Sequence, residues 1–313
     1  MCTAISYQTR HHYFGRNLDL DFSYKETVTI TPRNFTFSFR HAPEMKTHFG
    51  IIGMAYVAGD YPLYYDATNE KGLSMAGLRF MDYADYKPMA EGKDNISPFE
   101  FIPWILGQCG TVEEACSLLE RISLLDENFS EELPLTPLHW IISDKERSIT
   151  VESVKEGLKI YENPVGVLTN HPTFDLQMES LKEYEHLTTQ KDGAKGLPGD
   201  WSSQSRFARA VFVKKNAVAG EGEGESVGQF FHILDAVAQP NGCICTGEQK
   251  YMRTIYSSCC NTDLGIYYYI TYGNRQIIGV DMHGVNLDGA TLALYPLMDQ
   301  QQIVMCDKNI QIR

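Results

Sequence analysis

The order of the expected secondary-structure elements is the feature that most restricts the fold of this chain. Runs rich in β-branched and aromatic residues, bounded by Gly, Pro, Asn and Asp, predict strands through most of residues 2–80. Helical periodicity follows at 97–122, strand signals return at 138–170, and helices at 171–239 precede strands at 251–280. Because this order lacks regular strand–helix alternation, it favours an α+β architecture of antiparallel sheets covered by segregated helices.

Three local patterns add detail to this outline. CTAISY at 2–7 and YFGRNLDLDF at 13–22 predict a β-hairpin at the start of the chain. Thr111 and Glu114 have the spacing of a capping box, which predicts the first turn of a helix. The Gly- and Glu-rich sequence at 219–226 predicts a solvated loop.

Charge and hydropathy exclude several classes of partner. The 40 acidic residues outnumber the 27 Lys and Arg, giving a net charge of −13, and no dense basic cluster is present. We therefore expect no nucleic-acid partner and no binding to an anionic membrane. The longest nearly apolar run, at 101–107, is far shorter than the roughly 20 residues of a membrane helix. The length of 313 residues alone suggests about two domains.

The cysteines indicate a reducing compartment. Eight Cys in 313 residues are too few for a disulfide scaffold and follow no secretory segment, so we expect a cytoplasmic protein. No set of Cys and His has the spacing of a structural zinc site, so no metal is expected. Cys243, Cys245, Cys259 and Cys260 are interpreted as buried free thiols that pack as small apolar groups.

Cys2 is the exception among these cysteines. Removal of Met1 is expected before a small residue, and it would leave one residue with both a thiol and an α-amine. Their reference pKa values, about 8.5 and about 7.7–8.0, allow the amine to accept the thiol proton near neutral pH. Cys2 could therefore act as an N-terminal nucleophile that is activated by its own α-amine. The alternative is that a Cys at this position is incidental.

Charged residues in the second strand of the hairpin favour the catalytic interpretation. Arg16 and Asp19 lie on the strand expected to pair with the one that carries Cys2. A guanidinium beside a thiol favours the thiolate, and a carboxylate can orient the ammonium. The alternative is an ordinary surface ion pair between Arg16 and Asp19.

Several sequence blocks resemble the choloylglycine hydrolases, a family that includes bile salt hydrolases and penicillin V acylases. The blocks cover nearly the whole chain in the family's order: MCTAI, YFGRNLD, TPRNF, YYDATNEKGLSMAGLRF, FIPWILGQC, ESVKEGLKIYENPVGVLTNHPTFD and LPGDWSSQSRF. The resemblance implies one N-terminal nucleophile hydrolase domain over 1–313, with Met1 removed, and replaces the expectation of two domains. It also implies an αββα sandwich of four layers, with two stacked, mostly antiparallel sheets between helices.

The resemblance assigns a role to each residue that matches the family's motif. Cys2 would attack an amide carbonyl and form an acyl-thioester, with Arg16 and Asp19 as its charged neighbours. Asn170 would donate to the oxyanion, and Arg206 would stabilise Asp19 and the local charge. Without the resemblance, Asn170 is interpreted as a residue that caps a turn, and Arg206 as a cation on the surface of a helix.

The sequence departs from the family at two places. Arg79 stands where bile salt hydrolases have Asn and penicillin V acylases usually have Tyr. Its guanidinium could donate to the oxyanion or meet the anionic group of a substrate, or it could crowd the site and compete for Asp19. The segment 188–201 is shorter than in many bile salt hydrolases, where it helps subunits to assemble. Tyr64 and Tyr65 either line an acyl pocket or pack in the core.

The resemblance therefore implies a bile salt hydrolase-like amidase that cleaves glycine or taurine from conjugated bile acids without a cofactor. The blocks NPVGVLTN, FIPWILGQC and YSSCC are more similar to gut-bacterial bile salt hydrolases than to penicillin acylases. A penicillin V acylase or other N-acyl amidase is the alternative, and a non-catalytic steroid- or acyl-binding homologue is an alternative of another class. The expected partners are a small-molecule substrate and further copies of the chain, with a tetramer as one expected size.

Overall fold

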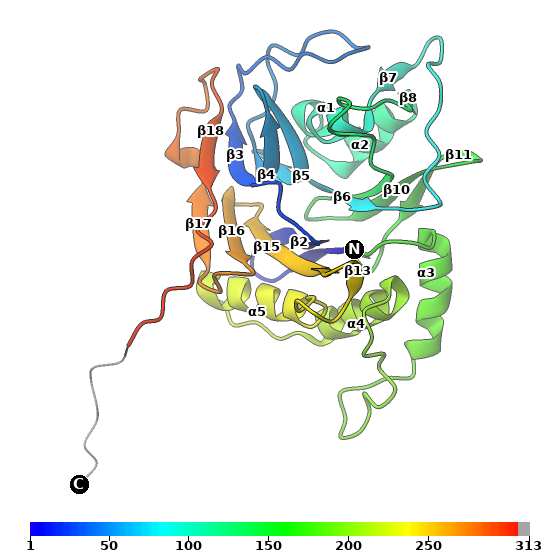
Figure 1. Cartoon of the computed structure of the whole chain (residues 1–313), viewed down its shortest axis with the longest axis vertical. Coiled ribbons are helices and arrows are strands. Elements are labelled where there is room, and N and C mark those ends of the chain that lie inside the picture. Colours follow the sequence, from blue (N-terminus) through cyan, green and yellow to red (C-terminus); the bar gives the residue numbers. More distant parts are fainter. Residues whose placement is uncertain (306–313) are drawn as a thin grey trace.

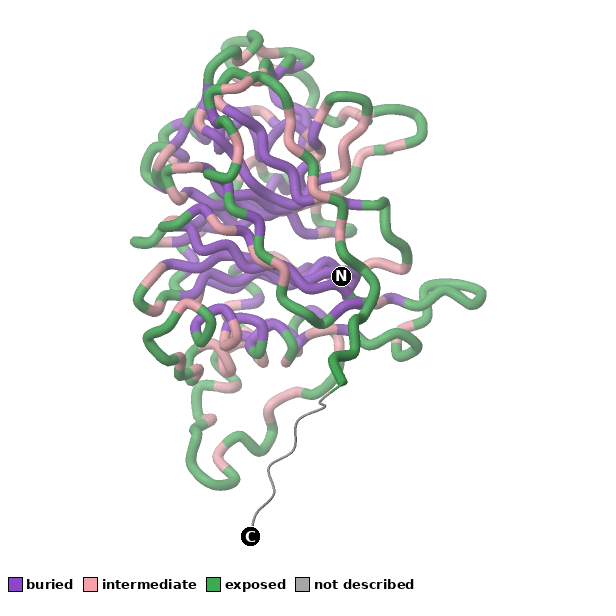
Figure 2. Tube along the Cα trace, turned by 90° about the vertical axis from the view of Figure 1, so that its left-hand side faces the viewer, coloured by how far each residue is buried: buried purple, intermediate pink, exposed green. Residues whose placement is uncertain are grey.

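The computed structural model describes residues 1–305, which stack in four layers of helices, sheet, sheet and helices (Figure 1). Figure 2 shows that buried residues concentrate in the central layers, whereas the connecting loops are exposed. The α+β class and the αββα order expected from the sequence are confirmed. None of the described helices is long and apolar enough to span a bilayer.

The first sheet has six strands, and every neighbouring pair in it is antiparallel. Its strands in spatial order are β12 (Val167–Leu168), β1 (Cys2–Gln8), β2 (His12–Leu20), β15 (Arg253–Asn261), β16 (Ile266–Thr271) and β17 (Ile278–Asp281). The predicted terminal hairpin is β1 and β2, and it occupies the middle of this sheet. The predicted late hairpin is β15 and β16.

The second sheet has eight strands and is also antiparallel throughout. Its strands in spatial order are β11 (Gly157–Glu162), β10 (Ser148–Val154), β9 (Leu138–Ser143), β6 (Ser74–Arg79), β5 (Tyr61–Asn69), β4 (Ile51–Ala58), β3 (Thr27–Thr31) and β18 (Ala293–Pro296). β6, β10 and the second half of β5 are buried on both faces, as expected for a sheet in an inner layer.

Helices cover the outer face of each sheet. The helices over the eight-stranded sheet are α1 (Phe101–Gln108) and α2 (Val112–Leu119). Those on the six-stranded side are α3 (Phe174–Leu181), α4 (Ser203–Asn216) and α5 (Glu223–Asp235). The short elements are η1 (Pro98–Glu100), η2 (Lys182–Tyr184), η3 (Met282–Gly284), the parallel pair β7 (Asp94–Ile96) and β8 (Ile122–Leu124), and the hairpin of β13 (Cys245–Gly247) and β14 (Lys250–Tyr251).

One predicted helix boundary and one predicted cap need correction. α5 begins at Glu223, within the segment 219–226 expected to be a loop. Its first turn is stabilised by a tertiary contact, because the Tyr13 hydroxyl donates to the Glu223 carboxylate at 2.7 Å. The capping box of α2 is only half formed: Thr111 Oγ1 accepts from the Glu114 amide at 3.2 Å, but the Glu114 carboxylate binds the amide of Gly110 instead of Thr111.

Candidate active site

The terminal hairpin places Cys2 beside the charged residues of β2. The register of β1 and β2 sets Cys2 opposite Leu18 and Ala4 opposite Arg16. Residues directly opposite in an antiparallel pair share a face, so the side chains of Cys2 and Arg16 lie on the same face of the sheet. Asp19 follows Leu18 and therefore lies on the other face.

Arg16 extends from the six-stranded sheet to the eight-stranded sheet. Its side chain is completely buried, and Nη1 donates to the carbonyl oxygens of Tyr65 at 2.9 Å and Gly77 at 2.5 Å. Its Nη2 is also buried and has no hydrogen-bond partner among the described residues. The two carbonyls therefore fix the guanidinium in place, and Nη2 can still donate a hydrogen bond near Cys2.

Asp19 lies next to the N-terminus. Thr254 Oγ1 donates to Asp19 Oδ1 at 2.6 Å, and the Met1 α-amine donates to the Asp19 carbonyl oxygen at 2.9 Å. Burial raises the pKa of the Asp19 carboxyl, and the N-terminal ammonium and Arg206 oppose that rise. Burial also lowers the pKa of the Met1 amine. The carboxyl and the ammonium therefore favour each other's charged form.

Arg206 reaches the start of the chain from α4. It is completely buried, so its interpretation as a helix-surface cation is wrong. Nη1 donates to the Cys2 carbonyl oxygen at 2.5 Å and to Thr3 Oγ1 at 2.8 Å, and Nη2 donates to Asn170 Oδ1 at 2.7 Å. One guanidinium therefore connects Cys2 to Asn170.

Asn170 lies after β12 and is bound at both ends of its side chain. Oδ1 accepts from the Cys2 main-chain nitrogen at 2.8 Å, and Nδ2 donates to the Arg79 carbonyl oxygen at 2.8 Å. Its own amide donates to Ser203 Oγ at 2.9 Å. The structure thus brings five predicted residues into one hydrogen-bonded or charge-coupled group: Cys2, Arg16, Asp19, Asn170 and Arg206.

The charges of this group act on the Cys2 thiol, which is 1% exposed. Burial alone raises the pKa of the thiol, but Arg16 and the N-terminal ammonium more than offset it. The pKa of Cys2 therefore lies below its ordinary value, whereas burial raises the pKa of Cys259 and Cys260. Among these three cysteines, Cys2 alone has the electrostatic environment of a nucleophile.

A largely apolar cavity of about 460 Å³ adjoins the site. Tyr65 and Gly77, whose carbonyls bind Arg16, line it, and so do Tyr64 and the partly exposed Arg79. Arg79 makes no ion pair or hydrogen bond with Asp19 among residues 1–305, so the structure does not favour the alternative in which Arg79 competes for Asp19. The remaining aromatic lining comes from five separate parts of the chain: Tyr24, Tyr56, Phe99, Phe129 and Trp140.

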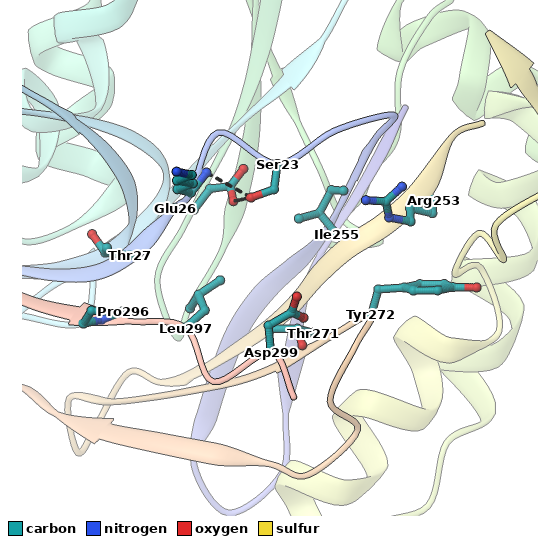
Figure 3. Close-up of a pocket in the computed structure, with 11 residues that line it drawn as sticks. Ser23, Glu26, Thr27, Arg253, Ile255, Thr271, Tyr272, Pro296, Leu297 and Asp299 are labelled. Atoms are coloured by element: carbon teal, nitrogen blue, oxygen red, sulfur yellow. Dashed lines mark hydrogen bonds between the residues drawn. The ribbon is translucent and has the colours of Figure 1, made fainter. Parts of the chain in front are cut away.

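A second cavity, of about 400 Å³, lies between the Ser23–Thr27 segment, β15 and the chain after β18 (Figure 3). Figure 3 shows Arg253 and Tyr272 on one side of it and Pro296 on the other. Ser23 donates to the buried Glu26 carboxylate at 2.6 Å. None of the six predicted site residues lines this cavity, so it is separate from the site around Cys2.

The remaining cysteines only partly follow expectation. Cys259 and Cys260 are buried free thiols, but Cys243 and Cys245 are exposed, so the interpretation of that pair as buried is wrong. Cys243 precedes the exposed β13–β14 hairpin, and Cys245 is the first residue of β13. Cys306 lies outside the described residues. Within residues 1–305, no group of three or more His, Cys, Asp or Glu could hold a metal ion.

Sequence reasoning missed the polar residues that support the site from other elements. Thr254, Ser203 and Gln177 bind Asp19 and Asn170, and Asp66 lies near Arg16. A carboxylate inside a strand, as in YYDAT, was the available signal for Asp66, because a buried carboxylate requires partners. The partners of Thr254 and Gln177 depend on tertiary structure and leave no local pattern.

Comparisons with known proteins agree over nearly the whole chain. A family model described as linear amide C–N hydrolases, choloylglycine hydrolase family, matches residues 2–295. A bile salt hydrolase/transferase of Lactiplantibacillus plantarum is 50% identical over 319 residues, covering 96% of this chain and 98% of the relative. One from Clostridium perfringens is 39% identical, covering 94% and 96%.

Solved structures extend this similarity to three dimensions. The C2A mutant of a conjugated bile acid hydrolase from Clostridium perfringens matches with a TM-score of 0.91 and 37% identity, over 98% of this chain and 100% of that chain. A penicillin V acylase from Agrobacterium tumefaciens matches with a TM-score of 0.79 and 21% identity, over 96% and 94%. At that identity, the second match shows a shared fold alone.

Proposed function

Because the chain belongs to the choloylglycine hydrolase family of linear amide C–N hydrolases, we propose that it hydrolyses glycine- or taurine-conjugated bile acids through an acyl-thioester on Cys2. The observation that carries this proposal is the convergence of Arg16, Asn170 and Arg206 on Cys2, beside a cavity with an aromatic lining. A steroid acyl group is a large rigid apolar body, and a concave aromatic surface of this kind suits it.

The first step is the activation of the nucleophile. Removal of Met1 converts the Cys2 main-chain nitrogen, now bonded to Asn170 Oδ1, into the α-amine. This amine takes the thiol proton, and Arg16 stabilises the thiolate. Asp19, which acts on the Met1 amine in the unprocessed chain, is assigned to balance the charge of the resulting ammonium.

The thiolate then attacks the amide carbon and forms a tetrahedral intermediate. Asn170 Nδ2 has two hydrogens, of which Arg79 O receives one, and we assign the second to the oxyanion. The Cys2 ammonium protonates the leaving nitrogen, so glycine or taurine departs and the acyl-thioester remains. Water activated by the amine then hydrolyses the thioester, releasing the bile acid and regenerating the thiol.

Arg79 is assigned to the anionic end of the substrate. Its guanidinium lies at the wall of the cavity and is partly exposed, which leaves it available to a carboxylate or sulfonate. Guanidinium groups bind such oxyanions through two parallel hydrogen bonds. The net charge of −13 does not oppose this assignment, because Arg16, Arg79 and Arg206 concentrate positive charge around the site.

Sequence features support three proposals on the state of the protein. From the family resemblance we propose one N-terminal nucleophile hydrolase domain over residues 1–313 and a homo-oligomer, of which a tetramer is one expected size. From the small number of cysteines we propose that the protein is cytoplasmic. Light scattering after size-exclusion chromatography measures that size. A monomer at working concentration would contradict the assembly.

The proposed function is tested by a substrate panel with a matched pair of variants. Purified protein should release cholate from glycocholate or taurocholate, and Cys2→Ala should abolish this release. Cys109→Ala, which removes a buried thiol of the outer helical layer, should keep it. Faster cleavage of penicillin V would favour the acylase alternative, and bile-conjugate binding without turnover would favour the non-catalytic one.

A further inference from the structure

Asp66 is a buried acidic residue that the proposed reaction does not use. It lies on β5 and is 1% exposed. Tyr256 Oη donates to its Oδ1 at 2.6 Å, while Tyr267 Oη and Ser258 Oγ donate to its Oδ2 at 2.6 and 3.0 Å. All three donors come from the six-stranded sheet. Three hydroxyl donors fit the ionised form, because a carboxylate only accepts hydrogen bonds.

The same residues connect Asp66 to Arg16. Ser258 Oγ, which donates to Asp66, accepts from the Arg16 amide at 3.1 Å. The Arg16 guanidinium binds the carbonyls of Tyr65 and Gly77. Tyr65 precedes Asp66 in β5, and Gly77 follows the residue that pairs with Asp66 in β6. The guanidinium therefore lies beside the Asp66 position, between the two sheets.

Cationic and acidic groups at the centre of the molecule are equal in number only when Asp66 is included. Positive charge comes from Arg16, Arg206 and the N-terminal ammonium. Negative charge comes from Asp19, Asp66 and the Cys2 thiolate. Because charges interact strongly at low dielectric, an unbalanced positive charge here would act on the thiolate.

We propose that Asp66 is a positioning residue for the Cys2 nucleophile: its carboxylate, held by Tyr256, Tyr267 and Ser258, balances the charge of Arg16 and limits how strongly Arg16 stabilises the thiolate. This inference rests on the proposed role of Cys2. It gives the buried carboxylate a role in nucleophile strength, because an overstabilised thiolate is a weaker nucleophile.

The direction of the effect follows from the charges that face each group. Cys2 faces Arg16, Asp19, Arg206 and the N-terminal ammonium, and Arg79 acts on that ammonium from β6. Asp66 faces Arg16 and the Tyr256, Tyr267 and Cys260 side chains of β15 and β16. Asp66→Asn keeps the shape of the side chain and removes one negative charge. The remaining excess of positive charge favours the thiolate, so the pKa of Cys2 falls.

The experiment measures alkylation of Cys2 by iodoacetamide as a function of pH, read by mass spectrometry of the N-terminal peptide. In Asp66→Asn, the midpoint should move about one pH unit lower than in the unsubstituted protein. The plateau rate at high pH should fall roughly threefold, because thiolate reactivity decreases with pKa. An unchanged midpoint, or one that moves to higher pH, would overturn the proposal.

Two controls separate this effect from loss of a buried carboxylate in general. Glu100→Gln removes an equally buried carboxylate that binds the amides of Arg40 and Ser97 beneath α1. Its Cys2 midpoint should equal that of the unsubstituted protein, and a shift as large as that in Asp66→Asn would contradict a specific role. Alkylation of the exposed Cys243 and Cys245 in the same sample shows that the iodoacetamide is active.

A double variant keeps the proposal testable if Asp66→Asn does not fold. Arg16→Gln with Asp66→Asn removes both partners, so neither charge remains buried without the other. Its melting temperature should exceed that of Arg16→Gln alone, which leaves Asp66 buried without its partner, and a value equal to or below it would overturn the charge pairing. Since neither measurement uses a bile acid, failure of the proposed substrate would leave both results interpretable.

Discussion

At the scale of single residues, the two ends of the Asn170 amide bind different partners, which suits the two roles proposed for it. Its oxygen accepts from the Cys2 nitrogen and from Arg206, while its nitrogen donates to Arg79 O and retains a second hydrogen. The resemblance to a family predicts a donor at Asn170, but not these partners. They come from β1, α4 and β6, elements that only the fold brings together. The resemblance therefore proposes Asn170 as a site residue but does not predict how its side chain is held.

Arg79 allows a test of charge at the substrate's anionic end. Arg79→Gln keeps much of the side-chain length and removes the guanidinium, so KM for glycocholate should rise about tenfold with little change in kcat. The methyl ester of glycocholate, which lacks the anion, should show no such rise. Steady-state kinetics on both substrates measure the difference. Equal changes for acid and ester would show that Arg79 acts by shape rather than by charge.

At the scale of elements, local sequence predicted most helices and hairpins but not where tertiary contacts move their ends. The terminal hairpin, α2 and α4 follow from periodicity and from residues at their caps. α5 starts earlier than its apolar periodicity because the Glu223 carboxylate is bound by Tyr13 and by Asn261 Nδ2. Such a start depends on residues that are distant in sequence, so no local pattern indicates it.

The N-cap of α2 gives a prediction at this scale. Thr111→Ala removes the hydroxyl that accepts from the Glu114 amide, which should lower the free energy of unfolding by about 1 kcal/mol. Thr111→Ser retains an acceptor and should lose much less. Urea denaturation measures both values. Because α2 lies in the outer layer, kcat should stay the same, and a large loss of activity in Thr111→Ala would contradict the separation of this helix from the site.

At the scale of the whole molecule, the two inner sheets explain why so many polar residues are buried. One sheet packs against the other, and helices cover both outer faces, so strands such as β10 and β15 are buried along almost their whole length. The order of sequence signals predicted antiparallel sheets with segregated helices. The number of layers followed only from the family resemblance, because periodicity does not say which faces meet.

A buried histidine makes the free energy of unfolding depend on pH. Burial lowers the pKa of His12 to about 4, where its ring contacts Ser6 and Thr262. In the unfolded chain the same imidazole has a pKa of about 6.5, so the unfolded state binds the proton first as the pH falls. The contribution of neutral His12 to the free energy of unfolding is therefore complete above about pH 6.5 and is lost as the pH falls toward 4. The loss should amount to as much as about 3 kcal/mol.

Unfolding by urea at several pH values measures this loss. The free energy of unfolding should fall more steeply between pH 6.5 and 4 in the unsubstituted protein than in His12→Gln. The neighbouring and more exposed His11 provides a matched control, since His11→Gln should keep the steep dependence. Identical slopes in all three proteins would rule out His12 as the source.

The central claim is that Cys2, freed from Met1, carries the acyl group. The most direct measurement is the mass of the N-terminal peptide from protein quenched in acid during turnover of glycocholate. We expect a peptide that begins at Cys2 and carries one cholyl group, which disappears when substrate is exhausted. An active protein whose whole population retains Met1, or whose Cys2 never carries the acyl group while cholate is released, would contradict it.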